Sequence, residues 1–260
     1  GIGGGRVLDT AKYAAHISKA VYICMPTSLS NDSLASPFAV LETYGKARKT
    51  LDCKIPTAII VDTNMIINAP QEQTLSGIGD TIAKHTALFD WKLAAEKGSD
   101  KIDDFAYALS RMSFDSVYHC DQKDMKSRVF IRILSRALVM GGLAMEIAGS
   151  SRPCSGSEHL FAHAIEEHYP DIRITHGLAV ALGTIPACIF QGQDPSGLLS
   201  FYRTHGLSIA PSSYGISEEM FADMWEKART IRPGRVTVLE NVHPDRVQLN
   251  EIYHRMKEEA

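Results

Sequence analysis

Three histidines and an aspartate could together bind a metal ion. His159 and His163 stand four residues apart in a stretch with helical spacing, so their imidazoles share one face of a helix. His176 opens the next predicted helix, and Asp80 lies early in the first long one. Two imidazoles and a carboxylate leave a coordination position open, which suits a catalytic divalent cation that polarises a carbonyl. Because the chain holds 10 histidines, capping or surface roles explain the same residues equally well.

A glycine-rich turn at the start of the chain is a second candidate site. Gly3, Gly4 and Gly5 lead directly into a predicted helix over residues 6–19. Glycines let the backbone approach a ligand closely, and amides at a helix N-terminus can bind a phosphate. The spacing differs from the dinucleotide fingerprint with its distant acid. The glycines alone are therefore equally compatible with a plain loop at a chain end.

A polar loop follows a predicted buried strand over residues 21–25. The loop, residues 26–36, is rich in serine and also contains Asp32. Open α/β sheets bind ligands at the carboxyl ends of their strands. Its hydroxyls could bind phosphate or ribose, and Asp32 could accept hydrogen bonds from substrate hydroxyls. A capped polar turn is the alternative interpretation.

Two basic residues are further candidates for binding an anion. Lys84 lies one helical turn after Asp80 and so faces the same way. Arg152 stands in a turn over residues 149–153, where a guanidinium could hold an anionic group. Each is also explained as a solvated surface charge.

Two regions of different composition must position these residues. Residues 1–69 combine the helix over 6–19 with strands over 21–25 and 57–61, which predicts a βαβ unit with a parallel sheet. Residues 70–260 predict an α-helical domain, and a ligand cleft is expected between the two domains. The expected helices cover residues 72–97, 101–120, 123–148, 157–168, 175–191, 196–205, 216–229 and 245–259.

The composition is that of an ordinary folded protein. The 260 residues are 45% hydrophobic and 22% charged, which excludes a disordered or collagen-like chain. A net charge of −3 without a dense basic cluster argues against nucleic-acid binding. The 5 cysteines show no CxxC spacing, which favours free thiols in a reducing cytoplasm. The longest apolar stretch, residues 179–190, is too short and interrupted for membrane insertion.

Several strings of sequence resemble the sn-glycerol-1-phosphate dehydrogenases. This family belongs to the superfamily of metal-dependent alcohol dehydrogenases, glycerol dehydrogenases and dehydroquinate synthases. The strings lie in the expected order over nearly the whole chain: GIGGGRVLDTAKYAA, MPTSLSNDSLASPF, SGIGDTIAKHTALFDWKLA, GSSRPCSGSEHLFAHAIE and THG. The resemblance implies a dehydroquinate synthase-like fold, with an N-terminal α/β nucleotide-binding domain and an all-α C-terminal metal-binding domain. Because no strand is expected before the glycines, we expect the first domain to be truncated here.

The resemblance also implies a function. It is the interconversion of dihydroxyacetone phosphate and sn-glycerol 1-phosphate, or a close phosphorylated ketone and alcohol, by a cytoplasmic homo-oligomer. The cofactors would be NAD(P) and one divalent metal ion, with zinc expected first and nickel or iron as alternatives. The implied metal ligands are Asp80, His159 and His176. The implied cofactor-binding residues are Gly3, Gly4, Gly5, Arg6, Val7, Leu8, Asp9, Thr27, Ser28, Leu29, Ser30 and Ser36.

The implied substrate site surrounds the metal. Asp32, Asp80 and His163 would contact the substrate, and Asp80 and His163 are the expected catalytic residues. From charge and position, we add Lys84 and Arg152 as candidates for the substrate phosphate.

The chain departs from the family pattern beside the expected ligands. Leu178 stands where the family commonly has a glutamate after His-Gly, so a carboxylate beside the metal is lost, and Asn31 and Ser33 replace a histidine and a glycine. Two alternatives therefore stay open. One is a sugar-phosphate cyclase of the dehydroquinate synthase type, although Phe38 stands where those enzymes carry a lysine. The other is a non-catalytic member that keeps the fold as a binding module.

Overall fold

The first part of the chain forms the predicted strand–helix–strand unit. The computed structural model describes residues 1–42 and 48–259. The unit and the strand that extends its sheet are β1 (Ile2–Gly3), α1 (Gly5–Ser18), β2 (Ile23–Pro26) and β5 (Ala58–Ile59). The strands are parallel in the order β1-β2-β5. Parallel neighbours need a crossover, which α1 provides between β1 and β2. The predicted parallel sheet is confirmed.

One expectation about the start of the chain is wrong. A strand does precede the helix, because Ile2 and Gly3 pair in register with Met25 and Pro26. The amino group of Gly1 also donates a hydrogen bond of 2.9 Å to the Ile23 carbonyl. A strand of two residues is too short to show an alternating pattern, so the sequence offers no signal for it.

A hairpin and a short helix in this part are not expected from the sequence pattern. β3 (Phe38–Glu42) and β4 (Arg48–Asp52) are antiparallel partners. α2 (Thr63–Ile67) is capped by Asp62, whose carboxylate accepts the Asn64 N–H at 2.9 Å. β4 is mostly polar and α2 is barely longer than one turn, so neither carries a hydrophobic period long enough to recognise.

The rest of the chain is helical, as predicted. The helices are α3 (Gln71–Ile82), α4 (Lys84–Glu96), α5 (Asp104–Tyr118), α6 (Arg128–Ala148), α7 (Ser157–His168), α8 (His176–Phe190), α9 (Ser196–Thr204), α10 (Glu218–Ala228) and α11 (Arg246–Glu258). Each predicted helix is present, but the one expected over residues 72–97 is two helices that meet at Ala83. At this junction the Lys84 ammonium donates to the Asp80 carbonyl at 3.3 Å.

Helix α8 runs through the middle of the molecule. Residues 177–188 are all buried, and the helix packs against α3 and α7. This helix contains the longest apolar stretch of the sequence, whose hydrophobicity therefore serves the core. Among the described residues, no helix combines the length and apolar character that crossing a membrane requires.

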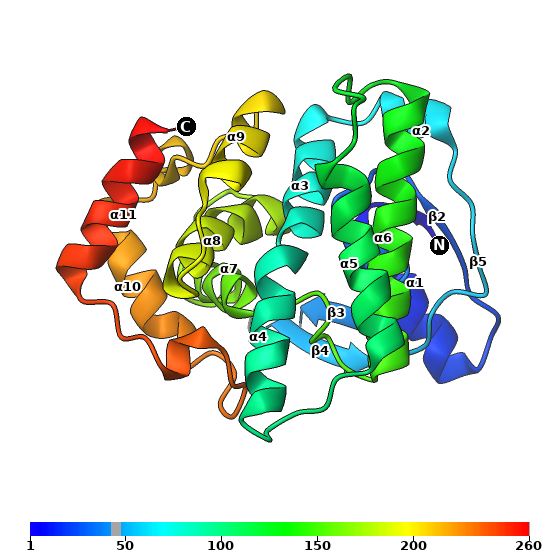
Figure 1. Ribbon diagram of the computed structural model, residues 1–260. Coiled ribbons are helices and arrows are strands. Elements are labelled where there is room, and N and C mark those ends of the chain that lie inside the picture. Colours follow the sequence, from blue (N-terminus) through cyan, green and yellow to red (C-terminus); the bar gives the residue numbers. More distant parts are fainter. Residues whose placement is uncertain (43–47, 260) are drawn as a thin grey trace.

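The hydrophobic core is continuous across the expected domain boundary. Leu8 and Leu34 from the first part belong to the same buried cluster as Ile78 and Leu134 from the helices. In Figure 1, α1 and β2 lie at the right of the view, α10 and α11 at the left, and α7 and α8 between them. The division into domains of residues 1–69 and 70–260 stays a prediction.

Candidate active site

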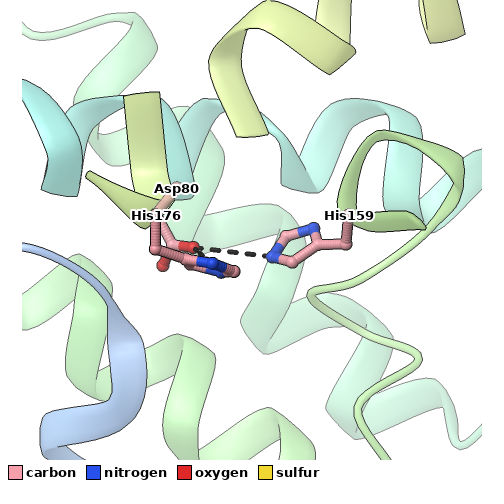
Figure 2. A group of neighbouring side chains, drawn as sticks. All are labelled: Asp80, His159 and His176. Carbon is pink, nitrogen blue, oxygen red and sulfur yellow. Dashed lines mark ion pairs between the residues drawn. The ribbon is translucent and has the colours of Figure 1, made fainter. Parts of the chain in front are cut away.

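Three predicted metal ligands converge from three helices. Asp80 comes from α3, His159 from α7 and His176 from the start of α8, and Figure 2 shows their side chains pointing toward one another. Asp80 Oδ1 lies 3.6 Å from His159 Nε2 and 3.9 Å from His176 Nε2. One ligand atom from each residue lies within 4.8 Å of the others. Ligand atoms around a tetrahedral zinc ion are about 3.4 Å apart. Small side-chain adjustments therefore suffice for this trio of two nitrogens and one oxygen to hold a divalent ion.

A different glutamate orients each of the two imidazoles. His159 Nδ1 lies 2.8 Å from Glu158 Oε1, and His176 Nδ1 lies 2.9 Å from Glu166 Oε1. A carboxylate at Nδ1 holds the proton on that nitrogen and leaves the Nε2 lone pair free for a metal. Both Nε2 atoms face Asp80, so the carboxylate–histidine pairs point the ligands at one place.

The backbones of α3 and α8 approach so closely that only glycine fits between them. A Cβ on Gly177 would lie 1.9 Å from the Ser76 carbonyl oxygen, and a Cβ on Gly79 would lie 2.3 Å from the Gly177 carbonyl oxygen. The Ser76 hydroxyl accepts the Gly177 N–H at 3.1 Å and donates to the Ser30 carbonyl at 2.9 Å. The close contact brings Asp80 on α3 beside His176 on α8.

Buried carboxylates fix the start of α7. Asp90 accepts the backbone N–H groups of Ser157 at 2.6 Å and Val238 at 2.8 Å. Burial and the nearby charge of Glu158 raise the pKa of Asp90 to about 6. Glu158 also accepts a hydrogen bond of 2.8 Å from the Thr86 hydroxyl on α4. These bonds anchor the first turn of α7 and with it the position of His159.

Asp32 and Lys84 flank Asp80, as predicted for substrate-binding residues. The Asp32 backbone N–H donates to Asp80 Oδ2 at 3.0 Å, and the Asp32 carboxylate lies 3.3 Å from the Lys84 ammonium. Burial and the charge of Asp80 raise the pKa of Asp32. Burial opposes the charge of Lys84, but nearby anionic groups, among them Asp32 and Asp80, outweigh it and raise the pKa of Lys84. The ammonium is therefore a fixed positive charge with its own carboxylate partner.

The electrostatics of the trio favour an ion pair that a metal can replace. Burial opposes ionisation of Asp80, but His159 and Lys84 outweigh burial and lower the pKa of Asp80 to about 2. Burial likewise opposes the charge of His159, yet Asp80 and Glu158 raise its pKa to about 9. Without a metal, His159 is thus a charged imidazolium, and a divalent cation would take the place of its Nε2 proton.

His163 lies beside the trio and is neutral. Its ring centroid is 6.4 Å from that of His159 and 5.8 Å from that of His176. Its Nδ1 lies 3.3 Å from Glu166 Oε2, and its Nε2 lies 3.2 Å from Arg232 Nη2. Burial is the main cause that lowers the pKa of His163 to about 4, and the Arg232 charge adds to it. The contacts assign the proton to Nδ1 and leave Nε2 as an acceptor.

Arg152 has partners other than the trio. Its Nε donates to Asp100 at 2.7 Å and its Nη1 donates to the Val236 carbonyl at 2.6 Å. The residue is only 5% exposed. It ties the turn before α7 to two distant segments, and its role toward a substrate phosphate stays a prediction.

The glycine turn and the polar loop lie together, as a shared cofactor site requires. An added Cβ on Gly4 would lie 3.8 Å from the Ser28 hydroxyl, and one on Gly5 would lie 3.7 Å from the Ser33 hydroxyl. Gly4 is the N-cap of α1 and provides no side-chain hydrogen bond, so the first amides of the helix are available to an anion. Of the other predicted cofactor residues, these are at least partly exposed: Gly3, Arg6, Val7, Thr27 and Ser30.

Four predicted cofactor residues are buried instead. Leu8 and Leu29 belong to the core, so only their main-chain atoms could reach a cofactor. Asp9 accepts from the buried Lys12 ammonium at 3.1 Å and from the Val40 N–H at 3.2 Å. Ser36 donates to the Phe38 carbonyl at 3.1 Å, which also accepts from the Lys12 ammonium at 2.6 Å. The side chains of Asp9 and Ser36 thus stabilise the loop through hydrogen bonds, and little of either is exposed to a cofactor.

Sequence reasoning missed the glutamates and one arginine of the site. Glu166 stands three residues after His163, a spacing that faces one side of a helix and could have identified it. Glu158 is adjacent to His159, a spacing that indicates no contact, and Arg232 is distant in sequence. The structure also places Leu178, the residue at which the chain departs from the family pattern. Its side chain is buried in the core, while Glu158 and Glu166 supply carboxylates beside the imidazoles.

Comparison with known proteins places this chain in a family. A family profile described as iron-containing alcohol dehydrogenase matches residues 1–70. The fold is similar to that of a probable glycerol dehydrogenase from Sinorhizobium meliloti, with a TM-score of 0.78 and 22% identity over 99% of this chain and 76% of the other. It is equally similar to glycerol dehydrogenase from Schizosaccharomyces pombe, with a TM-score of 0.78 and 21% identity over 100% and 68% of the two chains.

More similar sequences identify the branch. The chain is 41% identical over 240 residues to glycerol-1-phosphate dehydrogenase (NAD(P)+) from Sulfurisphaera tokodaii, covering 92% of this chain and 68% of the relative. It is 36% identical over 241 residues to the protein of the same name from Methanoregula boonei, covering 92% and 67%. The chain therefore belongs to the glycerol-1-phosphate dehydrogenase family, and the fold and family that the sequence strings resemble are confirmed.

Proposed function

We propose that this chain is a metal-dependent NAD(P) oxidoreductase that interconverts sn-glycerol 1-phosphate and dihydroxyacetone phosphate. The observation that carries the proposal is the convergence of Asp80, His159 and His176 in a chain whose relatives are named glycerol-1-phosphate dehydrogenases (NAD(P)+). Removing two hydrogens at the secondary alcohol of sn-glycerol 1-phosphate gives dihydroxyacetone phosphate. The nicotinamide cofactor accepts one of them as hydride and the other leaves as a proton.

The trio Asp80, His159 and His176 would hold the metal, with zinc expected first and nickel or iron as alternatives. A divalent ion supplies a Lewis acid that polarises a carbonyl oxygen. We propose that Asp32, Asp80 and His163 contact the substrate, because Asp32 donates its backbone N–H to Asp80 and the His163 ring lies beside that of His176. Neutral His163 holds a proton on Nδ1, shared with Glu166, and presents Nε2 as an acceptor. Nε2 accepts from Arg232 at 3.2 Å here, and in exchange for that contact it could orient a substrate hydroxyl and exchange a proton with it.

The cofactor is proposed to lie along the glycine turn and the polar loop. The free amides at the start of α1 would bind the pyrophosphate, and the hydroxyls of Thr27, Ser28 and Ser30 would bind neighbouring polar groups. Lys84 and Arg152 are retained as candidates for the substrate phosphate, although each has a carboxylate partner of its own. By analogy with the family, we propose a cytoplasmic homo-oligomer.

The test is a spectrophotometric assay on zinc-loaded protein with dihydroxyacetone phosphate and NADH or NADPH. The cofactor should be oxidised and sn-glycerol 1-phosphate should form. His176→Ala should lose this activity, and the matched variant His119→Ala should keep it because that side chain is exposed and remote in the fold. Release of inorganic phosphate from a sugar phosphate without net cofactor oxidation would instead identify a cyclase. Neither activity, with no metal bound, would identify a non-catalytic member.

A further inference from the structure

We propose that Arg232 and Arg235 bind the phosphate group of the substrate. Both lie on the loop between α10 and the short 3-10 helix η3 (Val238–Glu240). This inference rests on the proposed function, because it names the part of the site that distinguishes a phosphorylated substrate from an unphosphorylated one. On the same loop, Arg232 also donates to Ser151 and Arg235 donates to Ser155, both in the segment before α7.

Arg232 lies beside His163, close to the proposed metal ligands. Arg232 Nη2 lies 3.2 Å from His163 Nε2, on the side of His163 opposite its contact with Glu166. The His163 ring lies next to both histidines of the metal trio, with centroid distances of 5.8 and 6.4 Å. A three-carbon substrate with its carbonyl at the trio needs a cation only a few bonds further away, and the Arg232 guanidinium beside His163 is such a cation.

Arg232 and Arg235 have no carboxylate at ion-pair distance within residues 1–42 and 48–259, although the charge of Glu166 acts on Arg232, and those of Glu158 and Asp90 act on Arg235, from further away. Their acceptors are neutral: the Ser151 hydroxyl at 3.4 Å for Arg232 and the Ser155 carbonyl for Arg235. Both side chains are half-buried, and a guanidinium shielded from water is normally paired with an anion. A phosphate dianion would supply the missing negative charge.

Arg235 also has a hydrogen-bond donor without a partner among the described residues. The Nε–H of Arg235 is buried and has no hydrogen-bond partner in the described part of the chain. Buried donors nearly always have a hydrogen-bond partner, so such a group indicates a place where a ligand or a water molecule binds. Burial and the charges of Arg152 and Arg232 lower the pKa of Arg235 to about 9. Bidentate binding of phosphate by a guanidinium fork would satisfy the donor and relieve this repulsion.

The two residues named earlier for this role are already neutralised. Lys84 is paired with Asp32 at 3.3 Å, and Arg152 is paired with Asp100 at 2.7 Å. Binding a phosphate there would require breaking an existing ion pair. Binding a phosphate at Arg232 and Arg235 would break no ion pair formed by the described residues.

The experiment compares substrate preference in Arg232→Gln, Arg235→Gln and wild type. The quantity is the ratio of kcat/KM for dihydroxyacetone phosphate to kcat/KM for dihydroxyacetone. Each variant should reduce this ratio by about 10- to 100-fold, since charge-assisted hydrogen bonds to the phosphate are lost. Arg111→Gln is the matched control, because that exposed arginine pairs with Asp115 on its own helix, and its ratio should not change.

A second readout does not depend on activity. Calorimetric titration of the zinc-loaded protein with inorganic phosphate should give a Kd that rises by a similar factor in both variants, at unchanged metal content. If Arg232→Gln does not fold, Arg232→Lys takes its place, because it keeps the charge but loses the planar fork, and a smaller loss is expected.

The outcomes separate this inference from the proposed function. If wild type oxidises neither NADH nor NADPH with dihydroxyacetone phosphate, the proposed function fails, and weaker binding of inorganic phosphate by the variants still supports the anion site. If wild type is active but both variants keep the phosphate preference and the phosphate Kd, the inference is overturned. Loss of preference in Arg152→Gln alone would overturn it in favour of that residue.

Discussion

The histidines of the site depend on the carboxylates behind them. Glu166 contacts both His163 and His176, at 3.3 and 2.9 Å. One side chain therefore positions a proposed metal ligand and a proposed substrate-binding residue together. This explains how a site with Leu178 in place of the usual family glutamate still surrounds its imidazoles with negative charge.

Glu166→Gln should weaken zinc binding by about 10- to 100-fold, because an amide orients His176 less firmly and leaves its Nε2 less basic. The measurement is a competitive zinc titration against a chromogenic chelator. Glu167→Gln is the control, because that residue is exposed on the same helix. Equal zinc affinity in the Glu166 variant and wild type would remove Glu166 from the account.

Because the pKa of His163 is lowered in the folded protein, we expect stability to fall as the pH decreases. Its folded pKa is about 4, whereas an unfolded histidine titrates near 6.5. Between these values the unfolded chain binds the proton and the folded protein does not, so stability falls as pH decreases. Protonation of His163 in the unfolded chain should therefore lower the free energy of unfolding by about 2 kcal/mol between pH 7 and pH 5.

The measurement is denaturant unfolding of metal-free wild type and His163→Gln at both pH values. The loss of unfolding free energy on acidification should be smaller in the variant by that amount. Identical losses in the two proteins would contradict the assigned environment of His163.

Spacing suggested a group of candidate ligands and the family resemblance selected Asp80, His159 and His176 among them, but neither predicted the residues that hold these side chains. Asp80, His159 and His176 are residue types that can ligate a metal ion, and the structure brings them together. Glu158, Asp90 and Arg232 act through contacts between segments far apart in the chain. No local pattern reports such contacts, so these residues become visible only once the helices are packed.

At the scale of elements, the contact between α3 and α8 decides whether the trio can form. Gly177→Ala would place a Cβ 1.9 Å from the Ser76 carbonyl, so the helices must move apart. We expect a loss of about 1–3 kcal/mol in unfolding free energy from overpacking, together with weaker zinc binding.

Gly197→Ala is a matched control. Gly197 is also the second residue of its helix, and its new Cβ would lie 2.5 Å from the Tyr118 hydroxyl but within 4 Å of no backbone atom of another segment. Chemical denaturation and zinc titration of both variants provide the comparison. If Gly177→Ala were no more damaging than Gly197→Ala, close backbone contact would not be what positions Asp80 and His176.

Hydrophobic periodicity predicted the long helices well and the short elements poorly. α7 begins and ends where the sequence pattern indicates, because Gly156 and Pro170 bracket a clear amphipathic run. The break at Ala83 has no glycine or proline to announce it, since it lies where the Lys84 side chain meets the Asp80 carbonyl. The hairpin β3–β4 is stabilised by pairing with itself and by packing on α1, which periodicity does not detect.

At the scale of the whole molecule, a metal at the trio would link α3, α7 and α8. A ligand that binds only the folded state raises the unfolding free energy by RT ln(1 + [L]/Kd), about 2.7 kcal/mol at a hundredfold excess over Kd. Zinc should therefore raise the melting temperature of the wild type, measured by calorimetry, and a chelator should reverse the shift. His159→Ala should show no zinc-dependent shift, and an equal shift in that variant would mean that zinc binds elsewhere.

The central claim is that a divalent ion at Asp80, His159 and His176 is required to reduce dihydroxyacetone phosphate with NAD(P)H. The most direct measurement is the rate of cofactor oxidation by metal-free protein titrated with zinc. We predict no rate without metal and a linear rise that levels off at one zinc ion per chain. A rate that does not depend on added metal, or none at any zinc concentration, would contradict the account.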